Sequence, residues 1–371
     1  MKIVFLASSL GSGGAERTMV YLSDYFVKNG YDMAFVNISG KLFYELNEKI
    51  TYESLNISSQ CNNLFERFIN IVKRYSCVRS SIKKLTPDVV ISLLPETSKY
   101  ILSLHKRGNF KLITSERNNP ELDGNVKLKH KVFVHSDGIV FQTSRAKNWY
   151  PESIGKKGVV IHNAVGNDLV YKIPVDIVRK KKISAVGRLS KQKDYPTLLR
   201  AFKTVSEYYP EYYLEIFGDG PDEAELKALA ENLGVSRKVR FMGAHKDAVL
   251  QIADSTCYVM SSIYEGMPNA LMEAMAVGLP CVSTDCPNGP AELIVNGENG
   301  LLVPVGDVVA LAGAIVRMIE EKNFAETCGM NAKKILETHN VEKIAKQYID
   351  YIESVVKRKG KNGKCFNWQK Q

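Results

Sequence analysis

No stretch of the 371-residue sequence contains the run of about 18 apolar residues that a helix needs to cross a bilayer. Residues 1–10 have neither the apolar core nor the small-residue cleavage site of a secretory signal peptide, so we expect no such peptide. The seven cysteines are scattered, and no two of them are separated by two residues. Cys281 and Cys286 have no second cysteine or histidine pair near them, which argues against a zinc site. We therefore expect reduced cysteines in a cytoplasmic protein.

Negative charge is scarce in the first half of the chain. Residues 1–172 contain 24 Lys and Arg against 15 Asp and Glu, a net charge of +9, whereas residues 173–371 contain 26 against 25, a net charge of +1. This asymmetry indicates that the first half contacts an anionic surface or polymer. Hydrophobic residues at 45% and charged residues at 24% are typical of a soluble globular protein, and the length suggests two domains.

The chain opens with a strand pattern at residues 2–9, a glycine-rich loop and a helix pattern at residues 15–28. This order is typical of the start of a doubly wound α/β domain, and the glycines allow a phosphate or sugar to approach the helix N-terminus. The G-x-G-G spacing does not favour dinucleotide binding, since that motif is G-x-G-x-x-G. Further strands of the first half are predicted at residues 33–38, 88–94, 110–114, 138–142 and 158–162.

A second α/β series begins after a polar, proline-containing stretch at residues 166–182. Its strands are predicted at residues 182–186, 212–217, 239–242, 257–262 and 280–284. Its helices are predicted at residues 195–208, 222–232, 246–253 and 269–277. Three more helices are expected to close the chain, at residues 307–322, 323–339 and 341–357, before a basic tail.

Two carboxylates eight residues apart, Glu265 and Glu273, interrupt an otherwise apolar strand, loop and helix. We expect Glu265 in the loop and Glu273 about one and a half turns into the helix. Because that helix is apolar on nearly every side, it should be buried, and buried carboxylates need partners. A carboxylate accepts two hydroxyl hydrogens and a helix N-terminus favours phosphate, so the pair suits a nucleotide sugar. The alternative is one glutamate favoured by the helix dipole and a second in solvent.

Two other loops follow predicted strands, where open α/β sheets bind their ligands. Arg188 and Lys193 could neutralise a diphosphate, or could be ordinary surface residues. Residues 115–120 form a polar loop that is equally explained as a turn rich in Asn and Pro.

Residues 61–85 form a basic amphipathic helix pattern. Its apolar side is made of Leu64, Phe68, Ile71, Val72, Tyr75, Val78 and Ile82. Its basic residues are Arg67, Lys73, Arg74, Arg79, Lys83 and Lys84, and Glu66 is the one acid among them. Such a helix can lie on an anionic membrane, or it can pack on the core with a solvated basic face.

Taken together, these motifs resemble the glycosyltransferases of family 4, and the resemblance runs nearly end to end. The segments that carry it are residues 13–17 (GGAER), 142–147 (QTSRAK), 161–163 (IHN), 187–193 (GRLSKQK), 217–221 (FGDGP), 265–273 (EGMPNALME), 286–292 (CPNGPAE) and 296–300 (NGENG). The E-x7-E spacing of Glu265 and Glu273 is the signature of retaining members. Residues 286–292 resemble the branch that builds bacterial capsule, lipopolysaccharide and lipid-linked oligosaccharides.

The resemblance implies the GT-B architecture, in which two Rossmann-like, doubly wound α/β domains face a central cleft. Residues 1–168 would be an acceptor-binding domain and residues 169–340 a nucleotide-sugar-binding domain. Residues 341–357 would form a helix that packs back towards the first domain, and residues 358–371 a basic tail.

The resemblance also assigns residues to roles. Glu265 would contact the hydroxyls of the donor sugar, Glu273 the ribose, and Arg188 and Lys193 the diphosphate, with Gly14 against the donor. The remaining substrate-binding candidates are Gly13, Glu116, Arg117, Asn163, Gly187, Gly218, Gly266, Met267, Pro268 and Asn269. Many family members carry a His in the first domain, and Glu116 and Arg117 are the candidates to replace it here. No Asp-x-Asp motif is present, so we expect neither a metal nor another cofactor.

We therefore expect a retaining transferase that moves a hexose or N-acetylhexosamine from a nucleotide diphosphate sugar to a lipid-linked saccharide, and we expect the donor to be a UDP-sugar. Its other partner would be an anionic membrane surface, contacted by the basic N-terminal domain on the inner face of the cytoplasmic membrane, and not a nucleic acid. The alternatives are a GT-B nucleotide-sugar epimerase, which needs no acceptor, and a non-catalytic sugar-nucleotide-binding partner of another transferase.

Overall fold

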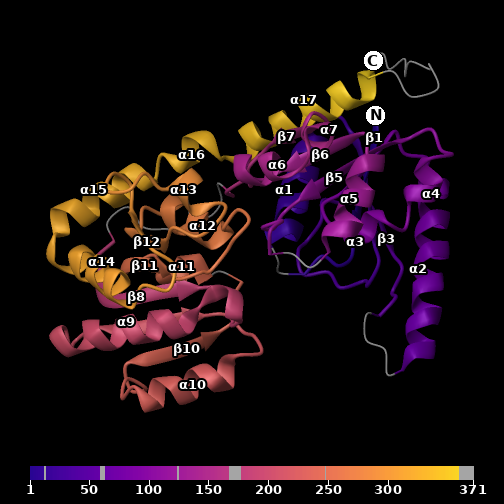
Figure 1. The fold of residues 1–371 in the computed structure, drawn as a ribbon. Coiled ribbons are helices and arrows are strands. Elements are labelled where there is room, and N and C mark those ends of the chain that lie inside the picture. Colours follow the sequence, from indigo (N-terminus) through magenta and orange to yellow (C-terminus); the bar gives the residue numbers. More distant parts are fainter. Residues whose placement is uncertain (12–13, 59–62, 123–124, 167–176, 247, 359–371) are drawn as a thin grey trace. The chain divides into compact units, whose positions relative to one another are not determined.

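A computed structural model describes the chain apart from residues 12–13, 59–62, 123–124, 167–176, 247 and 359–371 (Figure 1). The chain divides into two compact units. Unit 1 comprises Met1–Ala164 and the segment that begins at Val341, and unit 2 is Val165–Asn340. The division therefore falls four residues before the predicted end of the first domain at residue 168, which lies outside the described residues.

Unit 1 is built on a parallel sheet of seven strands in the order β3-β2-β1-β4-β5-β6-β7. These strands are β1 (Lys2–Ala7), β2 (Asp32–Asn37), β3 (Thr51–Ser54), β4 (Val89–Ser92), β5 (Lys111–Glu116), β6 (Gly138–Phe141) and β7 (Gly158–Val160). Strand order reverses between β1 and β4, which makes that gap the switch point of a doubly wound sheet. The central strands β1, β4 and β5 are buried along almost their whole length because helices cover both faces of the sheet.

Alternate residues of β1 face the two helical layers of unit 1. Ile3 and Phe5 pack with α1 (Gly14–Lys28) and α17 (Val341–Lys357), whereas Val4 and Leu6 pack with the end of α2 (Leu64–Leu85) and with α5 (Val126–His135). The shorter helices are α3 (Pro95–Ser98), α4 (Leu102–His105), α6 (Ser144–Trp149) and α7 (Glu152–Gly155).

Helix α17 joins unit 1 although unit 2 precedes it in the sequence. Its Tyr351 hydroxyl accepts a hydrogen bond of 2.7 Å from the Ile139 amide and donates one to the Lys157 carbonyl. On the far side of the same helix, the Tyr31 hydroxyl donates to Glu353 at 3.0 Å. The helix is thus bonded both to the sheet and to the turn after α1.

Unit 2 contains a second parallel sheet, of six strands in the order β10-β9-β8-β11-β12-β13. Its strands are β8 (Lys180–Val186), β9 (Tyr213–Phe217), β10 (Val239–Gly243), β11 (Ser255–Met260), β12 (Cys281–Thr284) and β13 (Leu301–Val303). Strand order reverses here between β8 and β11. The prediction of an α/β fold with two doubly wound sheets is therefore confirmed.

The helices of unit 2 cover both faces of its sheet. Helices α9 (Tyr195–Tyr208), α10 (Glu223–Asn232) and α14 (Val308–Glu320) pack on one face. Helices α11 (Ala248–Ile252), α12 (Asn269–Ala276) and α16 (Ile335–Thr338) pack on the other. The unit also contains the 3-10 turn η1 (Lys191–Lys193) and helices α13 (Pro290–Leu293) and α15 (Lys322–Ala332).

The sequence prediction did not include the helices α3 to α7 and α13 or the strand β13, and two further regions differ from it. Strand β3 was not expected, because its residues are polar and half-exposed, and backbone pairing with β2 is what makes it a strand. The single helix predicted at residues 323–339 is two helices, α15 and α16, and no proline or glycine marks the break between them. Within the described part of the chain, no helix has the length and apolar character needed to cross a membrane.

Replacing Tyr351 with Phe should destabilise unit 1. The substitution leaves the buried Ile139 N–H without its acceptor, which typically costs about 1–3 kcal/mol. Equilibrium denaturation in urea measures the loss, and Tyr208→Phe, at a tyrosine that is 75% exposed on α9, is the matched control. Equal stability of the two variants would show that the Tyr351 hydroxyl does not anchor the helix.

Candidate functional site

The switch point of the unit 2 sheet brings two predicted residues together. Lys193 follows β8 and Glu265 follows β11, and these neighbouring strands end at the same edge of the sheet. The chain leaves β8 and β11 towards strands on opposite sides, and open α/β sheets bind their ligands at such a reversal of strand order.

An ion pair joins the two side chains. Lys193 Nζ lies 2.6 Å from Glu265 Oε1, and the Ser262 hydroxyl donates to the same oxygen at 2.6 Å. Glu265 is only 6% exposed, so this is a charge held in low dielectric with two donors. Both donors use Oε1, and no described residue donates to Oε2, which leaves one carboxylate oxygen able to accept hydrogen bonds from a ligand.

Backbone contacts hold the two loops in register. The Ile263 amide donates to the Gln192 carbonyl at 2.8 Å, and the Gln192 side chain donates to the Tyr264 carbonyl at 2.9 Å. The Ser261 hydroxyl donates to the Lys193 carbonyl at 2.8 Å. These bonds join loops separated by about 70 residues, so the geometry of the ion pair is set by the fold around it.

The negative charge of Glu265 acts on its buried neighbours. Burial, and then the Glu265 charge, raise the pKa of the Cys286 thiol to about 12, so this cysteine is an uncharged part of the site. The same two causes raise the pKa of Tyr195. The pKa of Tyr258 is also raised, by burial first and then by neighbours that include both Glu265 and Glu273. The two glutamates therefore lie near the same tyrosine.

Glycines allow the strand ends to approach closely. A side chain at Gly187 would meet Lys193 Cε at 3.0 Å and the Tyr195 hydroxyl at 3.2 Å, and one at Gly218 would lie 2.0 Å from the Gly187 carbonyl oxygen. Gly218 also has a φ of +147°, which favours glycine. These two predicted residues thus shape the loop that carries Lys193.

Helix α12 begins beside Glu265, as predicted. Gly266, Met267 and Pro268 are buried, and Pro268 is the N-cap residue, with no side chain that could accept from the first helical N–H groups. Asn269 is half-buried at the first helical position, and Glu273 is half-buried one turn further on. The helix N-terminus therefore presents its positive end to the same loop.

Arg188 lies in the loop between β8 and η1 and is exposed. No described residue forms a hydrogen bond or an ion pair with its guanidinium. The guanidinium can thus reach a phosphate without losing a contact.

In unit 1 the structure corrects the expectation for Glu116. Its carboxylate is 1% exposed and contacts Lys129 Nζ at 2.7 and 2.9 Å, the Tyr150 hydroxyl at 2.5 Å and the Asn118 amide at 3.2 Å. With these contacts made inside the unit, Glu116 stabilises the fold and is not placed to receive a ligand. Strand β5 ends at this residue, so its side chain turns into the interior towards α5.

Asn163 and Arg117 belong to a second polar cluster. Asn163 is 3% exposed and contacts Arg117 at 2.5 Å and also Gln142. Arg117 is half-buried and also donates to the Thr18 hydroxyl at 3.3 Å. Asn163 therefore helps to fix the position of the Arg117 guanidinium. Of the predicted glycines, Gly13 lies outside the described residues and Gly14 is the first residue of α1.

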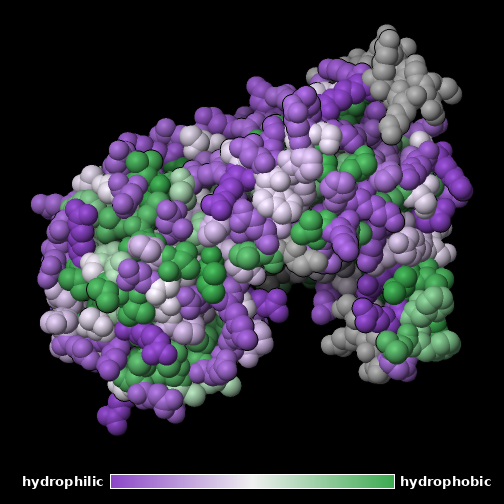
Figure 2. Space-filling model, viewed as in Figure 1, coloured by the Kyte–Doolittle hydropathy of each residue, from purple (hydrophilic) through white to green (hydrophobic). Residues whose placement is uncertain are grey.

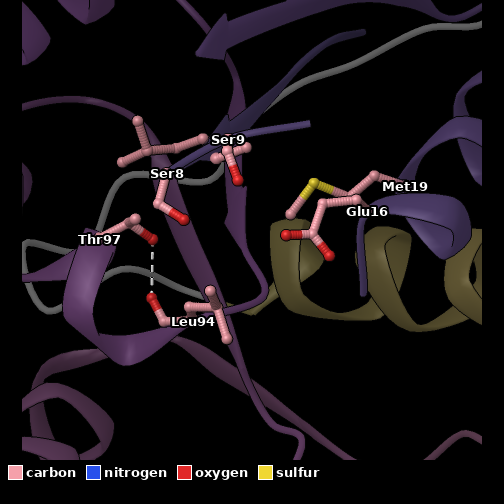
Figure 3. A pocket seen from close by; sticks show the side chains of 8 residues that line it. Ser8, Ser9, Glu16, Met19, Leu94 and Thr97 are labelled. Atoms are coloured by element: carbon pink, nitrogen blue, oxygen red, sulfur yellow. Dashed lines mark hydrogen bonds between the residues drawn. The ribbon is translucent and has the colours of Figure 1, made fainter. Parts of the chain in front are cut away.

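A small hollow lies at the switch point of unit 1. Figure 3 shows Glu16 and Met19 of α1 on one side and Ser8, Ser9 and Thr97 on the other. Leu6 and Ala7 at the end of β1, and Leu94 after β4, complete its wall. Its position corresponds to that of the Lys193–Glu265 pair in unit 2.

Glu16 is the functional candidate that the sequence interpretation missed. Burial raises its pKa above the ordinary value of 4.5, although its own backbone amide and the nearby Arg117 oppose the shift. No described residue forms a side-chain hydrogen bond with its carboxylate. A polar group that faces a hollow without such a partner is suited to accept a hydroxyl hydrogen. The sequence did contain a signal for Glu16, because this residue lies in the first turn of the helix that follows the first strand.

The described residues include no group of three or more His, Cys, Asp or Glu side chains arranged to hold a metal ion. What they offer an anion is the pair of cations Arg188 and Lys193.

Comparison with known proteins identifies relatives of the whole chain. Residues 173–335 match the family model "Glycosyl transferases group 1". An uncharacterized glycosyltransferase of Haemophilus influenzae is 28% identical over 94% of this chain and 98% of its own length. A Campylobacter jejuni alpha-1,4-N-acetyl-D-galactosaminyltransferase is 25% identical over 96% of this chain and 99% of its own length. Its name specifies a diNAcBac-PP-undecaprenol-linked saccharide. The structure of Anabaena Alr3699/HepE with UDP and glucose superposes with a TM-score of 0.77 at 18% identity, covering 95% of this chain and all of that one.

Replacing Glu16 with Gln should make stability less dependent on pH. When the pKa of a carboxyl is higher in the folded state, the protein loses stability as pH rises from 4.5 through that pKa. The reason is that ionising the buried carboxyl costs more free energy in the folded state than in the unfolded state. Glu16→Gln should therefore match the wild type near pH 4 and unfold at a higher urea concentration at pH 7.

The exposed Glu48→Gln controls for the loss of one negative charge. If Glu16→Gln and Glu48→Gln shift the urea midpoint equally at both pH values, burial is not the cause.

Proposed function

We propose that the chain is a group 1 glycosyltransferase that transfers a hexose or N-acetylhexosamine from a nucleotide diphosphate sugar to a lipid-linked saccharide, with retention at the anomeric carbon. The donor is a UDP-sugar and the enzyme is of the family 4 type. The observation that carries this proposal is the Lys193–Glu265 ion pair at the switch point of unit 2.

The donor is held by groups of both charges. Glu265 accepts from sugar hydroxyls through Oε2, and Glu273 accepts from the ribose. Lys193 has three N–H donors, of which Glu265 occupies one, so the others reach the diphosphate. Arg188 adds a planar fork that can bind two phosphate oxygens.

Transfer breaks the bond between the anomeric carbon and the diphosphate oxygen and forms a bond to the acceptor oxygen, whose proton leaves with the diphosphate. Negative charge grows on the diphosphate as the bond breaks. Arg188, Lys193 and the N-terminus of α12 are already oriented towards that charge, and such preorganised stabilisation is usually the largest catalytic term. On this proposal the cations take the place of a metal ion.

The acceptor belongs to a membrane. Relatives named for lipopolysaccharide synthesis and for an undecaprenol-linked saccharide support a lipid-linked acceptor in cell-surface glycan synthesis. The enzyme would then work as a peripheral protein on the inner face of the cytoplasmic membrane. The net charge of +9 on residues 1–172 fits that anionic surface.

Nucleoside diphosphate release with a panel of donors tests the proposed reaction, using undecaprenyl-diphosphate-linked saccharides in detergent as acceptors. One donor should release its nucleoside diphosphate in an acceptor-dependent way. Glu265→Gln keeps the size of the side chain but removes its charge, and should lower the rate by on the order of 10²-fold.

Glu231→Gln, on the exposed face of α10, should leave that rate unchanged. No release from any donor, or an unaffected Glu265→Gln rate, contradicts the proposal. Sugar interconversion without acceptor would identify an epimerase instead.

Arg188→Ala should separate ligand binding from stability. The guanidinium is exposed, so unfolding in urea should not change, whereas UDP binding measured by calorimetry should weaken about tenfold or more with the loss of a charged hydrogen bond. Arg237→Ala, another exposed arginine of unit 2, is the control. Equal UDP affinity of the two variants would remove Arg188 from the site.

A further inference from the structure

The first half of helix α2 exposes a continuous apolar face. Leu64, Phe65 and Phe68 are 82%, 72% and 64% exposed, and Ile71, Val72 and Tyr75 are also exposed. These residues recur at spacings of three and four, so they lie on one side of the helix. Figure 2 shows them as hydrophobic surface along the free end of α2.

The same stripe is buried in the second half of the helix. Val78 and Ile82 continue the spacing of Leu64, Phe68, Ile71 and Tyr75, and both are almost fully buried in the core of unit 1. The expectation that this helix packs on the core is thus correct for its second half and wrong for its first. The first half extends beyond the surface that could cover it (Figure 1).

Cations border the exposed face on one side and at one end. Arg67 lies beside it, and Arg79 and Lys83 continue the line of Phe65, Phe68 and Val72 towards the end of the helix, whereas Lys73 lies on the opposite side of the helix. None of these four forms an ion pair with any residue that the structure describes. By contrast, Lys84 pairs with Glu53 at 2.7 Å and Arg74 donates to the Ser58 carbonyl at 3.0 Å. Arg67, Arg79 and Lys83 can therefore bind anions without losing an ion pair within the described residues.

We propose that the first half of α2, Leu64–Tyr75, inserts its apolar side chains into the boundary between headgroups and acyl chains of an anionic bilayer. Arg67, Arg79 and Lys83 then bind lipid phosphates beside it. The segment is about 17 Å long and lies in the plane of the interface. This inference deepens the proposed function, since a lipid-linked acceptor is presented at such a surface.

Lipid fits this face better than a protein partner does. The face is one convex helix surface rather than a groove, and fluid acyl chains conform to such a surface without a complementary shape. Large apolar side chains bordered by Lys and Arg are the composition of helices that bind anionic membranes. A second copy of the chain would bring Arg67, Arg79 and Lys83 of both copies into repulsion.

Flotation of the purified full-length protein with vesicles tests the proposal, with no donor or acceptor present. Wild type should float with phosphatidylcholine vesicles that contain about one third phosphatidylglycerol, and far less with phosphatidylcholine alone. Phe65→Ser with Phe68→Ser should lower the partition coefficient at least tenfold. Arg79→Gln with Lys83→Gln should lower it several-fold and reduce its dependence on salt.

The control is Val309→Ser with Met330→Ser, which removes two exposed apolar side chains from unit 2. All variants should keep the wild-type urea midpoint and the wild-type transfer rate on detergent-solubilised acceptor, so failure of this proposal is separate from failure of the proposed reaction. Wild-type flotation of the Phe65, Phe68 variant overturns the proposal. The proposal is also overturned if the wild type does not bind vesicles but dimerises as its concentration rises, and the Phe65→Ser, Phe68→Ser variant does not dimerise.

Discussion

The ion pair between Lys193 and Glu265 is the interaction on which the proposed chemistry depends. A carboxylate that is 6% exposed requires a cation and hydrogen-bond donors, and Lys193 and Ser262 supply them at 2.6 Å. Because both use Oε1, the partners that keep the charge buried leave Oε2 available. The buried Glu265 is thus paired within the protein through Oε1 and still has Oε2 as a hydrogen-bond acceptor at the sheet edge.

That pair exists because of the sheet topology. The loops after β8 and β11 diverge at the point where strand order reverses, and parallel strands place both loops at one edge. Unit 1 repeats the arrangement between β1 and β4, where Glu16 faces the hollow in Figure 3. In both units a carboxylate occupies the switch point: Lys193 forms an ion pair with Glu265, and the charge of Arg117 opposes the rise in the pKa of Glu16.

Helix α2 shows how one sequence pattern can serve two environments. Its stripe of apolar residues has the same spacing along its length, but protein covers only the second half. Periodicity predicts which side of a helix is apolar, and it does not predict what lies against that side.

The sequence by itself determined the α/β class, the limits of most strands and helices, and the identity of Glu265, Lys193 and Arg188 as site candidates. These follow from local periodicity, from glycine and proline at the element ends, and from polar residues placed after strands. Only the tertiary structure decided the roles of Glu116, Asn163 and Glu16. Lys129 and Tyr150 satisfy Glu116, whereas Glu16 lacks such partners, and these contacts join residues distant in sequence. Burial and pairing depend on which elements pack together, and a local pattern does not record that.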